Sequence, residues 1–253
     1  MLEEDSVSQL FSLGHDFAEH IPCKAKQLMA KDELQFAYRS VMFFFFCKTY
    51  KSFQALRRLW DEGFPEDALP ILRSMFEGML QAKHIRQEPS RAQDFLDYDA
   101  YQRYKLYLKV KNSGDTELTR MIEQHSEHLK RLESEYARLG SAFRARKKWW
   151  GGSIEWLAQQ HECERKYNTL YWIQSNFVHS GVGSLPEFIK DAHGGIRVNC
   201  YPAKSTDPFI PIEATLYLIG VTDWTQQALE LELTDVARAS LSTFDQIVRN
   251  FAS

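Results

Sequence analysis

The strongest constraint on the fold is the spacing of apolar residues between Asp32 and Asp61, which recur at steps of three and four. This is the period of an amphipathic α-helix, so the spacing predicts one long helix over residues 32–61. Gly63 suits the position just after a helix, and Pro65 suits the first position of the next one. A second helix is predicted over residues 66–86. The short link between them indicates an antiparallel helical hairpin.

The facing apolar positions of the two helices are predicted to pack together, because burial of large apolar side chains is the main source of stability in a bundle. They are Phe44, Phe45, Phe53 and Leu56 in the first helix and Leu72, Met75, Phe76 and Met79 in the second.

Helical periodicity continues through most of the remaining chain, including a highly charged helix predicted over residues 117–139. Between residues 195 and 210, alternating apolar residues and several prolines predict a small β-hairpin or an ordered loop. We therefore expect an all-α, multi-helix bundle with long antiparallel helical hairpins, forming a single domain over residues 1–253. Its expected parts are an N-terminal helix at 1–31, a core bundle at 32–181, a loop or hairpin insert at 182–211 and a C-terminal helical pair at 212–253.

Composition and charge narrow the class of protein. Apolar residues make up 44% and charged residues 26% of the 253 positions, as in an ordered globular protein. The net charge of -3 argues against a globally basic nucleic-acid binder but leaves room for a local basic patch. The first residues are acidic, unlike a signal peptide, and the most apolar run, residues 41–47, is far shorter than the roughly 20 residues of a membrane span. A cytoplasmic protein without a membrane segment is expected.

The four cysteines, Cys23, Cys47, Cys163 and Cys200, are too far apart in sequence for a CxxC pair, so reduced and partly buried thiols are expected. The sequence contains no P-loop, GxGxxG, HExxH or GxSxG motif and no cysteines with zinc spacing. We therefore predict no cofactor and no metal ion.

Three polar residues share one face of the predicted 66–86 helix. Arg73, Glu77 and His84 fall within about 40° of one another when each residue advances the helix by about 100°. The other positions are largely apolar, so this stripe is expected to be partly buried, and Arg73 can pair with Glu77 four residues later. Two interpretations follow. The pair is a structural link between helices, or Arg73 binds a phosphate or another anion while Glu77 fixes its rotamer.

A second polar group lies where a predicted helix over residues 164–178 ends. Asn176 and His179 gather on one side of this helix, and His179 sits near its C-terminus, where the helix dipole favours an imidazolium ion. His179 either caps the helix or acts as a general acid/base or phosphate ligand. The opposite, core-facing side is predicted to include Leu170, Tyr171, Ile173 and Val178.

A basic and aromatic segment follows the charged helix: Arg144, Arg146, Lys147, Lys148, Trp149 and Trp150, ahead of Gly151 and Gly152. Cations for phosphates and rings for bases are the groups that bind RNA or single-stranded DNA. The alternative is a solvated helix end whose tryptophans fold into the core. Ser153 is predicted to begin the next helix.

Three stretches of this sequence resemble an uncharacterised bacterial family that is catalogued only as a domain of unknown function. They are residues 63–77 (GFPEDALPILRSMFE), 95–105 (FLDYDAYQRYK) and 176–180 (NFVHS). The resemblance covers residues 45–185 and implies an all-helical fold, with no activity attached to it.

More distantly, Asn176 and His179 at the end of a bundle helix look like the motif of HEPN-type proteins, many of which are RNases of toxin–antitoxin and phage-defence systems. In that motif an Arg, often followed by Asn, is separated from the His by four to six intervening residues. Here Ser175 stands where the Arg would be, and the spacing to His179 is one residue shorter. The resemblance therefore requires a cation from Arg73, from Arg165 or from a partner subunit.

Two functions from different classes remain open. In the first, the protein is a metal-independent RNase or RNA-binding protein of a bacterial defence or toxin-type system, with His179, Arg73, Glu77 and Asn176 as its catalytic residues. In the second, it is a non-catalytic helical scaffold or a regulatory module that binds proteins. The expected partners are RNA or single-stranded nucleic acid, a second copy of the chain in a homodimer, and a protein encoded nearby.

Overall fold

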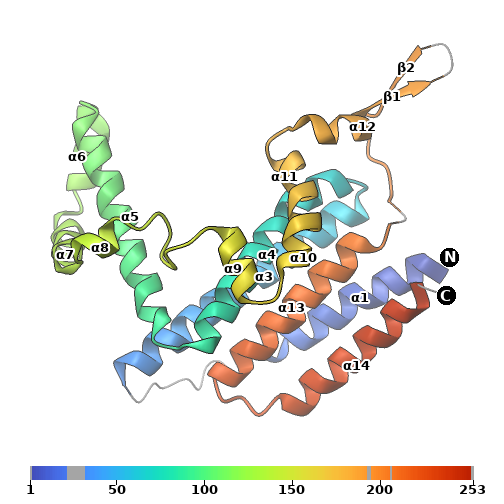
Figure 1. Cartoon of the computed structure of the whole chain (residues 1–253), viewed down its shortest axis with the longest axis horizontal. Helices are drawn as coiled ribbons and strands as arrows, with labels where there is room; N and C mark the ends of the chain where they lie inside the picture. The colour runs from blue at the N-terminus through green and yellow to red at the C-terminus, as the bar shows by residue number, and fades with distance from the viewer. Residues whose placement is uncertain (1, 22–31, 193–194, 206, 252–253) are drawn as a thin grey trace.

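The computed structural model describes residues 2–21, 32–192, 195–205 and 207–251, and helices dominate it (Figure 1). The helices are α1 (Leu2–Ala18), α3 (Glu33–Asp61), α4 (Pro65–Gln87), α5 (Arg91–Asn112), α6 (Thr116–Glu123), α7 (Ser126–Arg138), α8 (Ser141–Arg144), α9 (Ile154–Gln160), α10 (Glu164–Lys166), α11 (Trp172–Val178), α12 (Leu185–Phe188), α13 (Phe209–Ala228) and α14 (Thr234–Phe251). A π-helical turn spans Tyr167–Tyr171, and a 3₁₀ turn spans Val182–Ser184. The predicted all-helical bundle is confirmed.

The predicted helical hairpin is confirmed as α3 and α4. The Asp32 carboxylate accepts a hydrogen bond from the Gln35 backbone N–H at 2.8 Å and caps the start of α3. Gly63 adopts a φ of +81° in the link, and Pro65 is the first residue of α4. Helix α13 packs against both helices and also against α1 and α14, so these five helices enclose the main hydrophobic core (Figure 1).

The position predicted for Phe44 in the interface of the helical hairpin was wrong. Phe45, Phe53 and Leu56 are fully buried, whereas the side chain of Phe44 is 46% exposed. Four consecutive phenylalanines rotate through about 300° of helix, so they cannot all face the same core. Phe44 turns toward α5 instead, where its ring centroid lies 5.6 Å from that of Phe95.

The charged segment at 117–139 was predicted to be one helix, but it forms two. It breaks at residues 124–125, and α6 and α7 fold back onto α5. Buried side chains of α5 and α7, including Tyr104 and Leu132, form a small separate cluster that holds them together. Helices α5 to α8 therefore form an arm that extends away from the five-helix bundle (Figure 1).

Of the two alternatives predicted at 195–210, a hairpin within that range is wrong, and the described residues from Asn199 to Pro208 form a loop. Strand β1 (Ile189–Ala192) pairs antiparallel with β2 (Gly195–Val198), and the described residues between Asn199 and Pro208 contain no strand. Pro202 and Pro208 disfavour a strand in that segment, because proline donates no backbone hydrogen bond. The Ala203 backbone N–H instead donates to the Gly63 carbonyl at 2.8 Å.

The thiols follow the prediction only in part. Cys47 and Cys163 are free and partly buried, whereas Cys200 is free and exposed. Cys23 lies outside the described residues.

Within the described part of the chain, no helix combines the length and the apolar character that crossing a membrane requires.

Candidate functional site

Arg73 is the centre of a polar network between α4 and the π-helical turn. Its Nε donates to Glu77 Oε1 at 3.1 Å, and its Nη2 donates to the Tyr171 hydroxyl at 2.6 Å. The Tyr171 hydroxyl in turn donates to the same Glu77 oxygen at 3.0 Å. The Arg73 guanidinium also lies 4.3 Å from the centroid of the Tyr171 ring, within range of a cation–π interaction. Two partners thus fix the orientation of one permanently charged group.

His179 adjoins this network from the end of α11. Its Nε2 lies 3.4 Å from Arg73 Nη1. Arginine has only N–H donors, so in a hydrogen bond between these two atoms His179 Nε2 is the acceptor. Arg73 is one of the three cation sources considered for the motif, and the structure places it beside His179. The side chains of Arg73 and Glu77 are 16% and 32% exposed, so the network is reachable from solvent.

Tyr171 packs against the core, as predicted, but its place in the Arg73 network was not predicted. Burial first, and then the negative charge of Glu77, raise the pKa of its hydroxyl to about 12, so it remains a proton donor near neutral pH. The prediction failed for the residues after Tyr171, because the π-helical turn at Tyr167–Tyr171 rotates the next helix relative to a regular α-helix. As a result Ile173 and Val178, predicted to face the core, are 43% and 41% exposed, and Gln174 is buried in their place. A π-helical turn is itself a frequent mark of functional sites.

Asn176 supports the turn rather than the Arg73 network. Its amide nitrogen donates to the Trp172 carbonyl at 3.0 Å. Its Oδ1 lies against two glycines of the following turn, where an added Cβ would come within 2.6 Å at Gly181 and 2.8 Å at Gly183. Asn176 therefore requires two neighbours without side chains, and it helps to set the position of His179.

His84 does not join Arg73 and Glu77, although all three were predicted to share one stripe. It is buried two turns further along α4, where its Nδ1 lies 3.1 Å from His161 Nε2 and 3.1 Å from Arg91 Nη1. Burial first, and then the Arg91 charge, lower the His84 pKa to about 4. Burial and the neighbouring His84 lower the His161 pKa to about 4 as well. This histidine pair belongs to the packing of α4 against α9.

The basic segment at 144–150 divides into buried and accessible parts. Trp149 is buried, and its indole N–H donates to Gln81 Oε1 at 2.9 Å, so it is unavailable for stacking on bases. Arg144 lies over the Tyr136 ring at 5.0 Å, on the side of the arm. Arg146 pairs with Asp94 at 3.0 Å. Lys147 and Lys148 are exposed.

Two tyrosines of α5 hold this segment in place. The Tyr98 hydroxyl donates to the Lys147 carbonyl at 2.5 Å, and the Tyr101 hydroxyl donates to the Arg144 carbonyl at 2.7 Å. Downstream, the Ser153 side chain accepts from the Trp156 backbone N–H at 3.0 Å and starts α9, as predicted. The loop is thus anchored at both ends while the lysine side chains stay free to reach a ligand.

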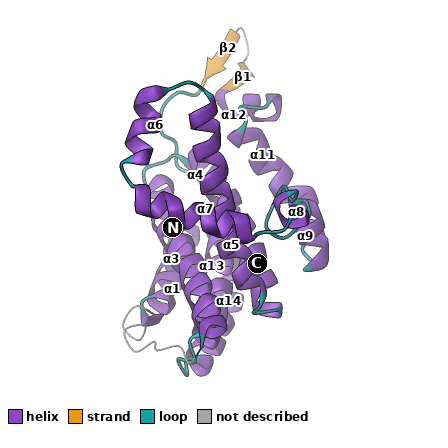
Figure 2. Cartoon of the chain, turned by 90° about the vertical axis from the view of Figure 1, so that its left-hand side faces the viewer, coloured by secondary structure: helices purple, strands orange, loops and turns teal. Residues whose placement is uncertain are grey.

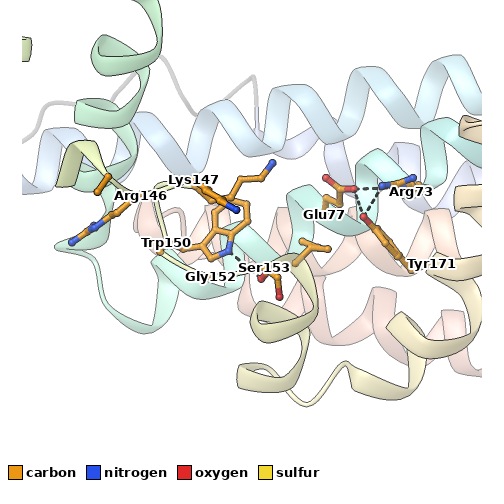
Figure 3. Close-up of a pocket in the computed structure, with 12 residues that line it drawn as sticks. Arg73, Glu77, Arg146, Lys147, Trp150, Gly152, Ser153 and Tyr171 are labelled. Atoms are coloured by element: carbon orange, nitrogen blue, oxygen red, sulfur yellow. Dashed lines mark hydrogen bonds and ion pairs between the residues drawn. The ribbon is translucent and has the colours of Figure 1, made fainter. Parts of the chain in front are cut away.

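A single cleft of about 630 Å³ joins the Arg73 network to this loop (Figure 3). Its lining comprises Arg73, Glu77, Ala145, Arg146, Lys147, Lys148, Trp150, Gly151, Gly152, Ser153, Ile154 and Tyr171. Figure 3 shows Arg73, Glu77 and Tyr171 at one end and Arg146, Lys147 and Trp150 toward the other. Among the lining residues, four carry a positive charge and Glu77 alone carries a negative one. The cleft is suited to an anion with an aromatic or apolar part.

A search for metal ligands among the described residues finds no group of three or more His, Cys, Asp or Glu side chains placed to hold an ion. The donors that surround the cleft are mainly cationic N–H groups, which bind anions directly.

A comparison with known protein families finds a match over more than half of the chain. Residues 39–196 match a family of unknown function, DUF5677. The chain belongs to this family. The matched range contains α4, the π-helical turn, α11 and the basic loop, so the whole cleft lies inside the region that defines DUF5677. No curated protein and no solved structure matches the chain.

Proposed function

We propose that this DUF5677 protein binds RNA through the cleft and cleaves it without a metal ion. The observation that carries the proposal is the continuity of the cleft, which brings Arg73, Glu77 and Tyr171 together with Arg146, Lys147, Lys148 and Trp150. Phosphate contacts from arginine and lysine supply most of the affinity for nucleic acids, and an aromatic ring gives an unpaired base a surface to stack on. Both kinds of group line the cleft.

In the proposed reaction, a phosphate of the RNA lies against the Arg73 guanidinium. Arg73 Nη1 turns from His179 to a phosphate oxygen, which frees the lone pair on His179 Nε2. His179 Nε2 accepts the proton of the ribose 2′-hydroxyl while the 2′ oxygen attacks phosphorus. The bond to the 5′ oxygen breaks, and this oxygen takes a proton from water. The products are a 2′,3′-cyclic phosphate and a free 5′-hydroxyl.

The other residues of the network act on Arg73 in this proposal. Glu77 and Tyr171 hold the guanidinium in one orientation, so that it meets the negative charge that develops on the phosphorane. Asn176 acts through the turn that carries His179. The proposal keeps the distant resemblance to HEPN-type RNases, with Arg73 in the role of the arginine that the local motif lacks.

The test is an RNA cleavage assay in the presence of a chelator. Wild-type protein is expected to release fragments that end in a cyclic phosphate, and Arg73→Ala and His179→Ala are each expected to lower the rate by at least roughly 100-fold. His128→Ala, which removes an exposed histidine on α7, is the matched control and should keep full activity. Wild-type protein that leaves every RNA intact, or a folded His179→Ala variant with wild-type activity, would overturn the proposal.

A second function is favoured by a different observation. Glu77 and Tyr171 already satisfy two donors of Arg73 without any ligand. Such a closed network is also typical of a structural link, and the protein would then be a non-catalytic scaffold or a regulatory module. Thermal unfolding separates the two functions. A structural Arg73 predicts a marked loss of stability in Arg73→Ala with no RNA phenotype, whereas a ligand-binding Arg73 predicts the reverse.

For the biological setting, we propose a cytoplasmic protein of a bacterial defence or toxin-type system. A protein encoded nearby is its proposed regulator. Both proposals rest on the RNase function and fall with it.

A further inference from the structure

Exposed apolar side chains are concentrated in the segment between Trp172 and Tyr201. Among the described residues, ten of the twenty exposed large hydrophobic side chains lie in this segment. Val182 and Tyr201 are the extremes, at 86% and 80% exposed. Single exposed apolar residues are normal on any protein, but a concentration of this kind marks an interaction surface.

The β1–β2 hairpin carries part of this surface on one face. Ile189 lies directly opposite Val198 in the antiparallel register, and Ile196 lies two residues before Val198. Side chains two apart on a strand, and side chains directly opposite on paired strands, share a face. Val198 and Ile196 are 62% and 69% exposed, so this face is uncovered. Figures 1 and 2 both show the hairpin projecting beyond the helices, at the end of the molecule.

The hairpin also has unpaired edges. Within the described residues the sheet consists of β1 and β2 alone, so each strand has one edge that no other strand covers. An isolated two-stranded hairpin is marginally stable in water, and an exposed edge pairs readily with another strand. Two copies of one strand pair antiparallel about a twofold axis, which is the symmetry of the commonest protein dimers.

From these observations we infer that the Trp172–Tyr201 segment is a dimer interface in which a second copy of this chain covers the hairpin face and pairs with a strand edge. The charge of the segment fits this occupant, because it contains two acidic residues, Glu187 and Asp191, and two basic residues, Lys190 and Arg197. Two such segments carry no net charge from these residues and do not repel each other. The segment also has no excess of cations that would bind nucleic acid. The segment is also about as long as one side of a stable interface, which uses roughly 20–30 residues.

The interface lies beside the cleft but does not share the cleft's cationic residues. The inference therefore does not depend on RNA cleavage, and each can fail without the other. Because α11 and His179 belong to this segment, the proposed dimer would place one His179 from each copy at its interface.

Light scattering after size-exclusion chromatography tests the inference on the full chain. The wild-type protein is expected to have the mass of two chains of 29.6 kDa. The double variant Ile196→Asp/Val198→Asp places charges on the hairpin face and should raise the dimer Kd by roughly 100-fold or more, so that the mass falls to one chain. Leu106→Asp on α5 is the matched control, because Leu106 is 61% exposed but outside the segment, and it should remain dimeric.

Hydrogen–deuterium exchange on the wild-type protein gives a second readout that needs no variant. Dilution from dimer to monomer should speed exchange in the amides of residues 189–198 and leave those of α3 unchanged. A wild-type chain that is monomeric at all concentrations would overturn the inference. So would a double variant that stays dimeric, or a partner of another kind that covers the hairpin while the chain alone remains a monomer.

Discussion

At the scale of single residues, the account depends on how one guanidinium is held. Arg73 contacts Glu77, Tyr171 and His179, which come from α4, from a π-helical turn and from the end of α11. An arginine with fixed partners is pre-organised, and less conformational freedom is lost when it binds a phosphate. In the proposed function, Tyr171 therefore orients Arg73.

Tyr171→Phe removes only the hydroxyl and tests this orientation. We expect RNA cleavage to fall roughly tenfold, the loss that corresponds to about 1.4 kcal/mol for one hydrogen bond to a charged group. Tyr201→Phe removes an equivalent hydroxyl from a position outside the cleft and should leave the rate of RNA cleavage unchanged. Equal rates for the Tyr171→Phe variant and the wild type would show that Tyr171 has no part in positioning Arg73.

The buried histidine pair predicts how stability depends on pH. His84 and His161 have pKa values lowered to about 4, below the usual 6.5. As pH falls below about 6.5, the unfolded chain therefore takes up protons that the folded chain excludes, and stability declines until about pH 4. The full loss is up to roughly 3 kcal/mol for each histidine.

Urea unfolding between pH 7 and pH 4 measures this dependence. His161→Gln keeps a donor for His84 Nδ1 but cannot titrate, so it should show a shallower decline than the wild type. An identical decline in the two proteins would mean that other groups account for the acid sensitivity.

At the scale of elements, the α3–α4 hairpin gives a matched pair of substitutions. Phe53 is 1% exposed in the core, whereas Phe44 on the same helix is 46% exposed. Phe53→Ala should destabilise the protein by about 3–5 kcal/mol, because it removes transfer free energy and leaves a cavity. Phe44→Ala should cost much less. Chemical denaturation of both variants checks the assigned faces, and similar losses would contradict them.

The elements also show what a sequence can predict here. The α3–α4 hairpin follows from local signals, namely a regular period, Gly63 and Pro65, and each of these acts within a few residues. The faces of α11 do not follow, because a π-helical turn leaves no mark in hydrophobic spacing and shifts every later position. The break at residues 124–125 was missed for a similar reason, since folding back onto α5 is a tertiary interaction.

The sequence likewise predicts one part of the candidate site and not the other. The pairing of Arg73 with Glu77 follows from their spacing of four residues on one helix. The cleft that unites them with Lys147 and Lys148 depends on how the basic loop returns to α4 after the arm. No local pattern encodes that path. The sequence also left the burial of Trp149 open, because it is decided by Phe95 and Gln81, which are far away in sequence.

At the scale of the whole molecule, the cleft is a product of two structural units. The five-helix bundle supplies Arg73 and Glu77 through α4, and the loop that leaves the arm supplies Lys147, Lys148 and Trp150. The arm itself contributes the tyrosines that anchor this loop. One role of the arm is thus to fix a basic loop opposite the Arg73 network, and the central claim is that RNA binds between the two.

Equilibrium binding of a fluorescent single-stranded RNA over a salt series tests that claim most directly. Lys147→Ala/Lys148→Ala should weaken binding and lower the slope of log K against log salt by about 1.4, or about 0.7 for each phosphate contact on a single strand. Arg73→Gln, at the other end of the cleft, should lower it by about 0.7. Lys48→Ala/Lys51→Ala removes two exposed charges from α3 and should leave both affinity and slope near wild type. If the cleft variants and the α3 control bind RNA equally well, with equal slopes, RNA does not bind in this cleft.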